Sequence, residues 1–81
     1  MALEPKTHAD TNTTQATHQK AAEHCVAASV AHKEAAKHLD AGDAKSAGFH
    51  AAVAHGHTIQ AHEHSETALE HTANAAAIKK Q

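Results

Sequence analysis

Alanine and histidine alternate along the second half of the chain with a period of seven residues. An alanine stands at every seventh position from Ala47 to Ala75. The residues three positions after these alanines are His50, His57, His64, His71 and Ile78. Residues that repeat at alternating spacings of three and four lie along one stripe of an α-helix. We therefore predict one long helix, from about residue 44 to residue 79, with an alanine and histidine stripe.

The first half of the chain contains a similar pattern. Its residues at spacings of seven are His18, Cys25, His32 and Leu39, and the alanines that follow the first three are Ala21, Ala28 and Ala35. The threonine-rich stretch 7–14 has weak helix propensity. Asn12, with Gln15 three positions later, would suit a later helix start, whereas Pro5 suits the first helical position. We favour the longer helix, about 5–40, with a frayed first third.

A break between the two halves predicts how the helices meet. Gly42 suits the left-handed position after a helix, and Asp43 suits the capping position before the next one. With a turn at 41–43, the chain becomes a single all-α domain, residues 1–81, that folds as an antiparallel hairpin of two long helices with an Ala/His heptad seam. The facing pairs expected from this turn are His32 with His50, Cys25 with His57, His18 with His64, and Thr11 with His71.

Alanine supplies most of the apolar content, which is 41% of the chain. A fully buried Leu or Phe contributes about 1.5–3 kcal/mol to stability, and an alanine contributes much less. We therefore expect bound metal, self-association or both to support the hairpin. A homodimer could form a four-helix bundle. The apolar residues outside the seam that could cover its second face are Val26, Val30, Val53, Ile59 and Leu69.

Charge and composition argue against several functional classes. The net charge is −2 with neutral histidine, and Phe49 is the one aromatic residue, so nothing indicates nucleic-acid binding. No segment is apolar enough to span a membrane, and Met1–Asp10 lacks the apolar core of an export signal. We expect a cytoplasmic protein, or a periplasmic one if a signal has been removed. We do not expect an enzyme, because no nucleophile has a matched base.

Eleven histidines and one cysteine supply the candidate chemistry. Neutral imidazole binds zinc, copper and nickel, and a thiolate adds a softer ligand. No two of these residues are three or four positions apart, and seven residues of helix span about 10.5 Å. One ion would therefore take ligands from both helices. The candidate metal ligands are His18, Cys25, His32, His50, His57, His64 and His71. The histidines expected beside the seam, as weak surface ligands or solvated side chains, are His24, His38, His55 and His62.

The pattern resembles the small histidine-rich metal-binding proteins of bacteria. The resemblance is carried by the runs Ala21-Ala22-Glu23-His24, Ala35-Ala36-Lys37-His38 and Ala61-His62-Glu63-His64. That family implies a helical bundle with seven-residue histidine repeats that binds several copper or other divalent ions and buffers or detoxifies them. The chain departs from the family by containing Cys25 and by lacking the export signal of its periplasmic copper-binding members.

Two hypotheses follow for the function. The first is a metal buffer or sequestration protein that binds Zn, Cu or Ni ions between its helices. The second is a pH-responsive helical assembly, or a protein-interaction module, without a dedicated metal. Protonation of all eleven histidines would reverse the sign of the net charge, so an assembly built on neutral histidines would come apart in mild acid.

Overall fold

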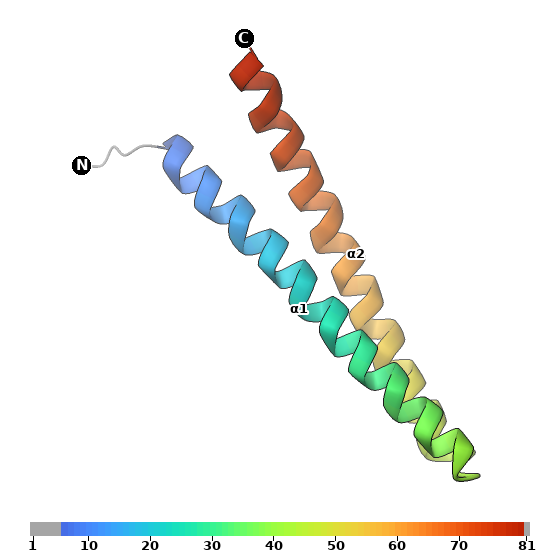
Figure 1. The fold of residues 1–81 in the computed structure, drawn as a ribbon. Helices are drawn as coiled ribbons and strands as arrows, with labels where there is room; N and C mark the ends of the chain where they lie inside the picture. Colours follow the sequence, from blue (N-terminus) through green and yellow to red (C-terminus); the bar gives the residue numbers. More distant parts are fainter. Residues whose placement is uncertain (1–5, 81) are drawn as a thin grey trace.

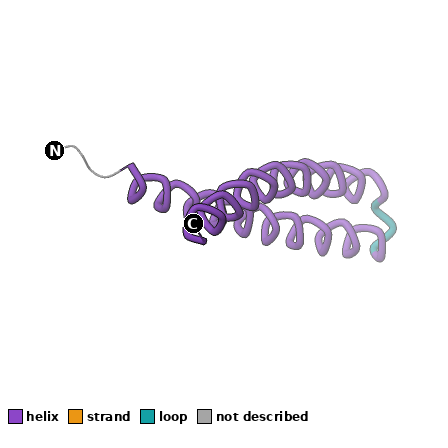
Figure 2. The backbone as a smooth tube through the Cα atoms, turned by 90° about the horizontal axis from the view of Figure 1, so that it is seen from above, coloured by secondary structure: helices purple, strands orange, loops and turns teal. Residues whose placement is uncertain are grey.

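The computed structural model describes the backbone of residues 6–80 and the side chains of residues 13–76. Within this part, the chain forms two long helices, α1 (Lys6–Asp40) and α2 (Ala44–Lys80), and no strand. The helices run antiparallel, lie close together next to the turn and separate toward their far ends (Figure 1). Viewed from above, they are two rods joined at one end (Figure 2). The predicted all-α helical hairpin is confirmed.

The turn ends one helix and begins the next with very few residues. Gly42 adopts a left-handed φ of 80°, the conformation that favours glycine after a helix. The backbone N–H of Gly42 donates to the carbonyl of Leu39 at 3.0 Å, and that of Asp43 donates to His38 at 2.7 Å. Asp43 then caps α2, since its Oδ1 accepts a hydrogen bond from the backbone N–H of Ser46 at 3.1 Å.

The start of α1 agrees with the longer of the two alternatives. Asn12 lies inside α1, six residues after its first described residue, Lys6, and therefore does not cap it. Pro5, the other expected start, lies outside the described residues, as does the side chain of Ile78 in the stripe of α2.

Alanine side chains form the buried interface between the helices. Among the residues whose side chains are described, the buried ones are Ala28, Ala31 and Ala35 on α1, and Ala47, Ala54, Ala61 and Ala68 on α2. Ala54 and Ala68 are completely buried. On α2, three half-buried histidines, His50, His57 and His64, alternate with these alanines. The methyl group of alanine allows two helix backbones to approach closely, which positions imidazole rings from both helices side by side.

On α1 the stripe that faces α2 differs from the predicted one. Cys25, His32 and Leu39, which were expected in the seam, are exposed. The interface instead contains Ala31, with His24 and His38 half-buried on either side of it along the helix. The predicted row, with Cys25 and His32, and the observed row, with Ala31, lie on opposite sides of the same two alanines, Ala28 and Ala35. Ala31 admits a closer approach of α2 than the imidazole of His32 would at the equivalent place, which explains the rotation of α1.

Large apolar side chains remain on the outside of the hairpin. More than two fifths of the surface of each of six such residues is exposed: Val26, Val30, Leu39, Phe49, Ile59 and Leu69. Val53 is half-buried. Over the described residues, neither α1 nor α2 contains a stretch long and apolar enough to cross a membrane.

Candidate metal centre

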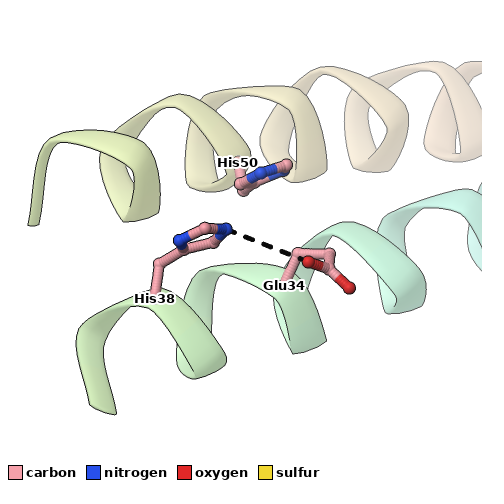
Figure 3. A group of neighbouring side chains, drawn as sticks. All are labelled: Glu34, His38 and His50. Atoms are coloured by element: carbon pink, nitrogen blue, oxygen red, sulfur yellow. Dashed lines mark ion pairs between the residues drawn. The ribbon is translucent and has the colours of Figure 1, made fainter. Parts of the chain in front are cut away.

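Three potential ligands from two helices meet near the turn. Glu34 and His38 are four residues apart on α1 and therefore share a face, while His50 reaches them from α2 (Figure 3). Each offers one ligand atom, and these atoms lie within 4.8 Å of one another. All three residues are half-buried. We call Glu34, His38 and His50 the turn cluster.

The two imidazoles of the turn cluster are held nearly parallel. The ring centroids of His38 and His50 are 5.0 Å apart, and their planes differ by 12°. Phe49 presents its ring to His50 edge-on, with centroids 5.4 Å apart and planes at 75°. The ring of His50 therefore has two other rings as neighbours, those of His38 on α1 and Phe49 on α2.

Carboxylates lie on both sides of the His38 ring. Its Nε2 is 4.0 Å from Oε1 of Glu34, and its Nδ1 is 3.6 Å from Oδ2 of Asp43. A carboxylate beside one ring nitrogen orients a histidine and favours metal binding at the other nitrogen. This arrangement leaves Nε2 of His38 facing the cluster. The other oxygen of Glu34, Oε2, pairs with the exposed ammonium group of Lys37 at 3.4 Å.

Asp43 is electrostatically suited to remain charged beside His38. Its pKa lies below its ordinary value, chiefly because the backbone N–H of Ser46 donates to its carboxylate, with a further contribution from the Ser46 side chain. The neighbouring His38 lowers this pKa by a smaller amount. The same cap that begins α2 therefore keeps a negative charge next to the turn cluster.

A second group of imidazoles lies near the middle of the hairpin. Nδ1 of His24 on α1 is 2.9 Å from Nδ1 of His57 on α2, and the ring centroids are 5.1 Å apart. His64, also on α2, stacks on His24 with centroids 5.6 Å apart and planes that differ by 8°. All three side chains are half-buried. We call His24, His57 and His64 the central cluster.

The structure brings together some of the ligands proposed from the sequence and separates others. His50 belongs to the turn cluster, and His57 and His64 belong to the central cluster. His18 is exposed but lies 2.9 Å, Nε2 to Oγ1, from Thr72 on α2. Cys25, His32 and His71 are exposed and belong to neither cluster. The expected pairs of His32 with His50, Cys25 with His57 and His18 with His64 are therefore replaced by the contacts of His38 and His24.

The sequence did not predict Glu34 as a ligand, and it predicted His38 and His24 only as weak surface ligands or solvated side chains beside the seam. The signal in the sequence that points to this pair is the spacing of four between Glu34 and His38, which places a carboxylate and an imidazole on one helix face. Of the other histidines, His62 forms an exposed pair with Glu66, Nε2 to Oε2, at 3.1 Å, which is an ordinary surface interaction.

Comparison of the chain with protein-family models, with curated protein sequences and with solved structures finds no match. The functional interpretation consequently depends on the geometry of the two clusters.

Proposed function

We propose that the chain binds transition-metal ions between its two helices and serves as a metal buffer or sequestration protein. The observation that supports this proposal is the turn cluster, in which two imidazoles and a carboxylate from different helices lie within 4.8 Å of one another. Nitrogen and oxygen ligands of this kind suit Zn²⁺, Cu²⁺ and Ni²⁺. Water would complete the coordination shell.

Small side-chain movements would close the turn cluster around an ion. In a tetrahedral zinc site with bonds of about 2.0–2.1 Å, neighbouring ligand atoms are about 3.3 Å apart. No separation in the turn cluster is longer than 4.8 Å, so each exceeds this value by about 1.5 Å at most, which rotation of half-buried side chains can supply. Partial exposure of all three ligands keeps the site open to solvent. Three protein ligands and an open position suit reversible uptake and release, as a buffer requires.

Metal binding at the turn cluster would also stabilise the hairpin. The buried side chains among the described residues are all alanines, so packing alone contributes little per residue. An ion held by Glu34, His38 and His50 joins α1 to α2 and binds the folded chain more tightly than the unfolded one. The binding free energy therefore adds to the folding free energy.

Isothermal titration of chelator-stripped protein with Zn²⁺, checked by native mass spectrometry, tests this proposal. The double variant His38→Ala/His50→Ala should lose one zinc equivalent. The matched control His32→Ala/His55→Ala removes one exposed histidine from each helix and should retain it. Equal zinc uptake by both variants would contradict a site at the turn cluster. Weak, continuous uptake by the wild type would favour the pH-responsive assembly instead.

We also propose that two hairpins associate, because among the described residues six large apolar side chains are exposed whereas the buried side chains are alanines. A second copy of the chain would cover part of that surface and bury the large side chains that the isolated hairpin leaves in water. Burial of each such side chain would contribute about 1.5–3 kcal/mol.

A further inference from the structure

The central cluster lies far enough from the turn to bind an ion of its own. His24 is about 21 Å from His38 along α1, given a rise of about 1.5 Å per residue. No residue is shared between the two clusters. Since nothing in the turn cluster positions His24 or His57, a second site here would be chemically and structurally independent of the first.

The closest contact in the central cluster joins two potential ligand atoms. Nδ1 of His24 and Nδ1 of His57 are 2.9 Å apart, and each ring is half-buried. Between two neutral imidazoles only one hydrogen can occupy this space, carried by one Nδ1 and accepted by the other. If that hydrogen moves to the outer Nε2 of its own ring, the lone pairs of both Nδ1 atoms face the space between the two rings.

This separation matches the geometry of a metal site. Two nitrogens that are each about 2.05 Å from one ion lie about 2.9 Å apart when the angle at the ion is about 90°, and about 3.3 Å apart when it is tetrahedral. The observed 2.9 Å therefore requires a movement of a few tenths of an ångström at most. A displacement of this size is within the reach of side-chain rotation for two half-buried histidines.

His64 has a different place in the cluster. It is seven residues from His57 on α2, a rise of about 10.5 Å that separates their points of attachment. Its ring stacks on His24, nearly parallel, and thereby restricts the orientation of that ring toward His57. We assign it the role of a positioning residue.

We propose that the Nδ1 atoms of His24 and His57 bind a second transition-metal ion, such as Zn²⁺, Cu²⁺ or Ni²⁺, in the middle of the hairpin, and that His64 positions the His24 ring. With two protein ligands against three, this site binds its ion more weakly than the turn cluster. The inference extends the proposed function to a second ion but rests on separate residues, so either site can fail without the other.

An ion at His24 and His57 would act on a part of the hairpin that the turn does not constrain. The helices separate toward their far ends (Figure 1), and a link in the middle limits this separation. Backbone amides between the central cluster and the far ends would therefore exchange more slowly once the second ion binds. An ion at the turn cluster would have less effect on the far ends, because the turn already joins α1 to α2 beside that cluster.

Zinc titration of the full, chelator-stripped chain tests the second site with three single variants. The wild type should bind two equivalents, His24→Ala should lose the weaker one, and His38→Ala should lose the stronger one. His32→Ala, an exposed histidine on the same helix as His24, should retain both. Retention of both equivalents by His24→Ala would overturn the inference. Loss in His24→Ala together with full retention in His38→Ala would instead refute the turn cluster and leave the central site standing.

Nuclear magnetic resonance of the wild-type chain tests whether His24 and His57 bind the ion without replacing either of them. Long-range proton–nitrogen correlations of the imidazole rings should show the Nδ1 signals of His24 and His57 shifting together during the second zinc equivalent. The His64→Ala variant should retain this joint shift but require at least tenfold more zinc to reach it. If the two Nδ1 signals do not move, the pair is a hydrogen-bonded contact of the interface and not a metal site.

Discussion

Oδ2 of Asp43 lies 3.6 Å from Nδ1 of His38, across the turn that joins the two helices. The same carboxylate caps α2 through its other oxygen. One side chain thus links the start of α2 to the orientation of a proposed metal ligand at the end of α1. Replacement of Asp43 should therefore have two effects that can be measured separately, one on the stability of the metal-free hairpin and one on its affinity for metal.

The cap formed by Asp43 should make the stability of the apo hairpin depend on pH in the acidic range. The pKa of Asp43 is lowered in the folded state, chiefly by the backbone N–H of Ser46. Its stabilising contribution is therefore fully present above the ordinary Asp pKa of about 3.9 and is lost as pH falls through the lower folded value. Thermal melts in chelator should show the advantage of the wild type over Asp43→Asn at neutral pH, and its loss in acid.

Asp40→Asn is the matched control for this experiment, since Asp40 is an exposed carboxylate at the end of α1. The Asp40→Asn protein should have a melting temperature close to that of the wild type at neutral pH, and this melting temperature should fall in acid as that of the wild type does. A wild type and an Asp43→Asn variant with the same melting temperature at every pH would show that the charge of Asp43 does not support the turn.

Asp43 should also affect metal affinity at neutral pH. Loss of a carboxylate beside a metal-binding histidine usually weakens binding about 10–100-fold. We expect Asp43→Asn to weaken zinc binding at the turn cluster by about tenfold in an isothermal titration, because His38 would be less well oriented. The weaker equivalent assigned to His24 and His57 should be unchanged, and a parallel loss at both sites would indicate a general effect on folding.

Close packing along the alanines should make Ala54 sensitive to enlargement. Ala54 is completely buried, so Ala54→Leu forces the helices apart. Overpacking of this kind usually costs about 1–3 kcal/mol, and each kcal/mol lowers the melting temperature of a domain of this size by about 4–8 °C. Ala52→Leu, at an exposed position of the same helix, should change stability by less than about 0.5 kcal/mol. Denaturant titration of both variants would settle the comparison, and similar stabilities would rule out a close-packed interface at Ala54.

Cross-linking can test which side of α1 faces α2. In a Cys25→Ser background, cysteines introduced by His38→Cys and His50→Cys should react with a short bis-maleimide to form an intramolecular link, because these rings stack at 5.0 Å. The pair His32→Cys and His50→Cys, suggested by the sequence alone, should link several-fold more slowly. Mass spectrometry of the products measures both rates, and faster linkage of the second pair would contradict the observed rotation of α1.

Self-association should depend on the apolar side chains outside the hairpin. Val26 and Val30 are one turn apart on α1 and exposed, so replacing both with lysine should weaken dimerisation at least tenfold in sedimentation experiments. Lysine at the exposed alanines Ala22 and Ala36 serves as the control for added charge. A wild-type chain that remains monomeric at all concentrations would disprove the homodimer.

Removal of metal should lower stability by a predictable amount. Free zinc at about 100 times its dissociation constant adds about 2.7 kcal/mol to the folding free energy. We therefore expect a chelator to lower the melting temperature of zinc-loaded protein by about 10–20 °C. The His38→Ala/His50→Ala variant should show a smaller change, and an unchanged melting temperature in the wild type would mean that zinc does not join the helices.

The sequence by itself determined the helices, the turn and the stripe of α2. Local chemistry explains this success, because alanine favours helix at almost every position and Gly42 and Asp43 have the conformational and capping properties that a tight turn needs. On α2 each alanine of the heptad row from Ala47 to Ala68 is followed three residues later by a histidine, from His50 to His71, so the stripe could be predicted from the sequence.

The tertiary structure alone decided which side of α1 meets α2. His32 and Ala31 occupy adjacent rows, and each row combines with Ala28 and Ala35 at the spacings that a helix interface requires. Helix propensity and periodicity are the same for either choice. The close approach of α2 distinguishes them, because only the row with the small side chain of Ala31 lets the backbones meet. That rotation brings Glu34, His38 and His24 to the interface and leaves Cys25 and His32 in solvent.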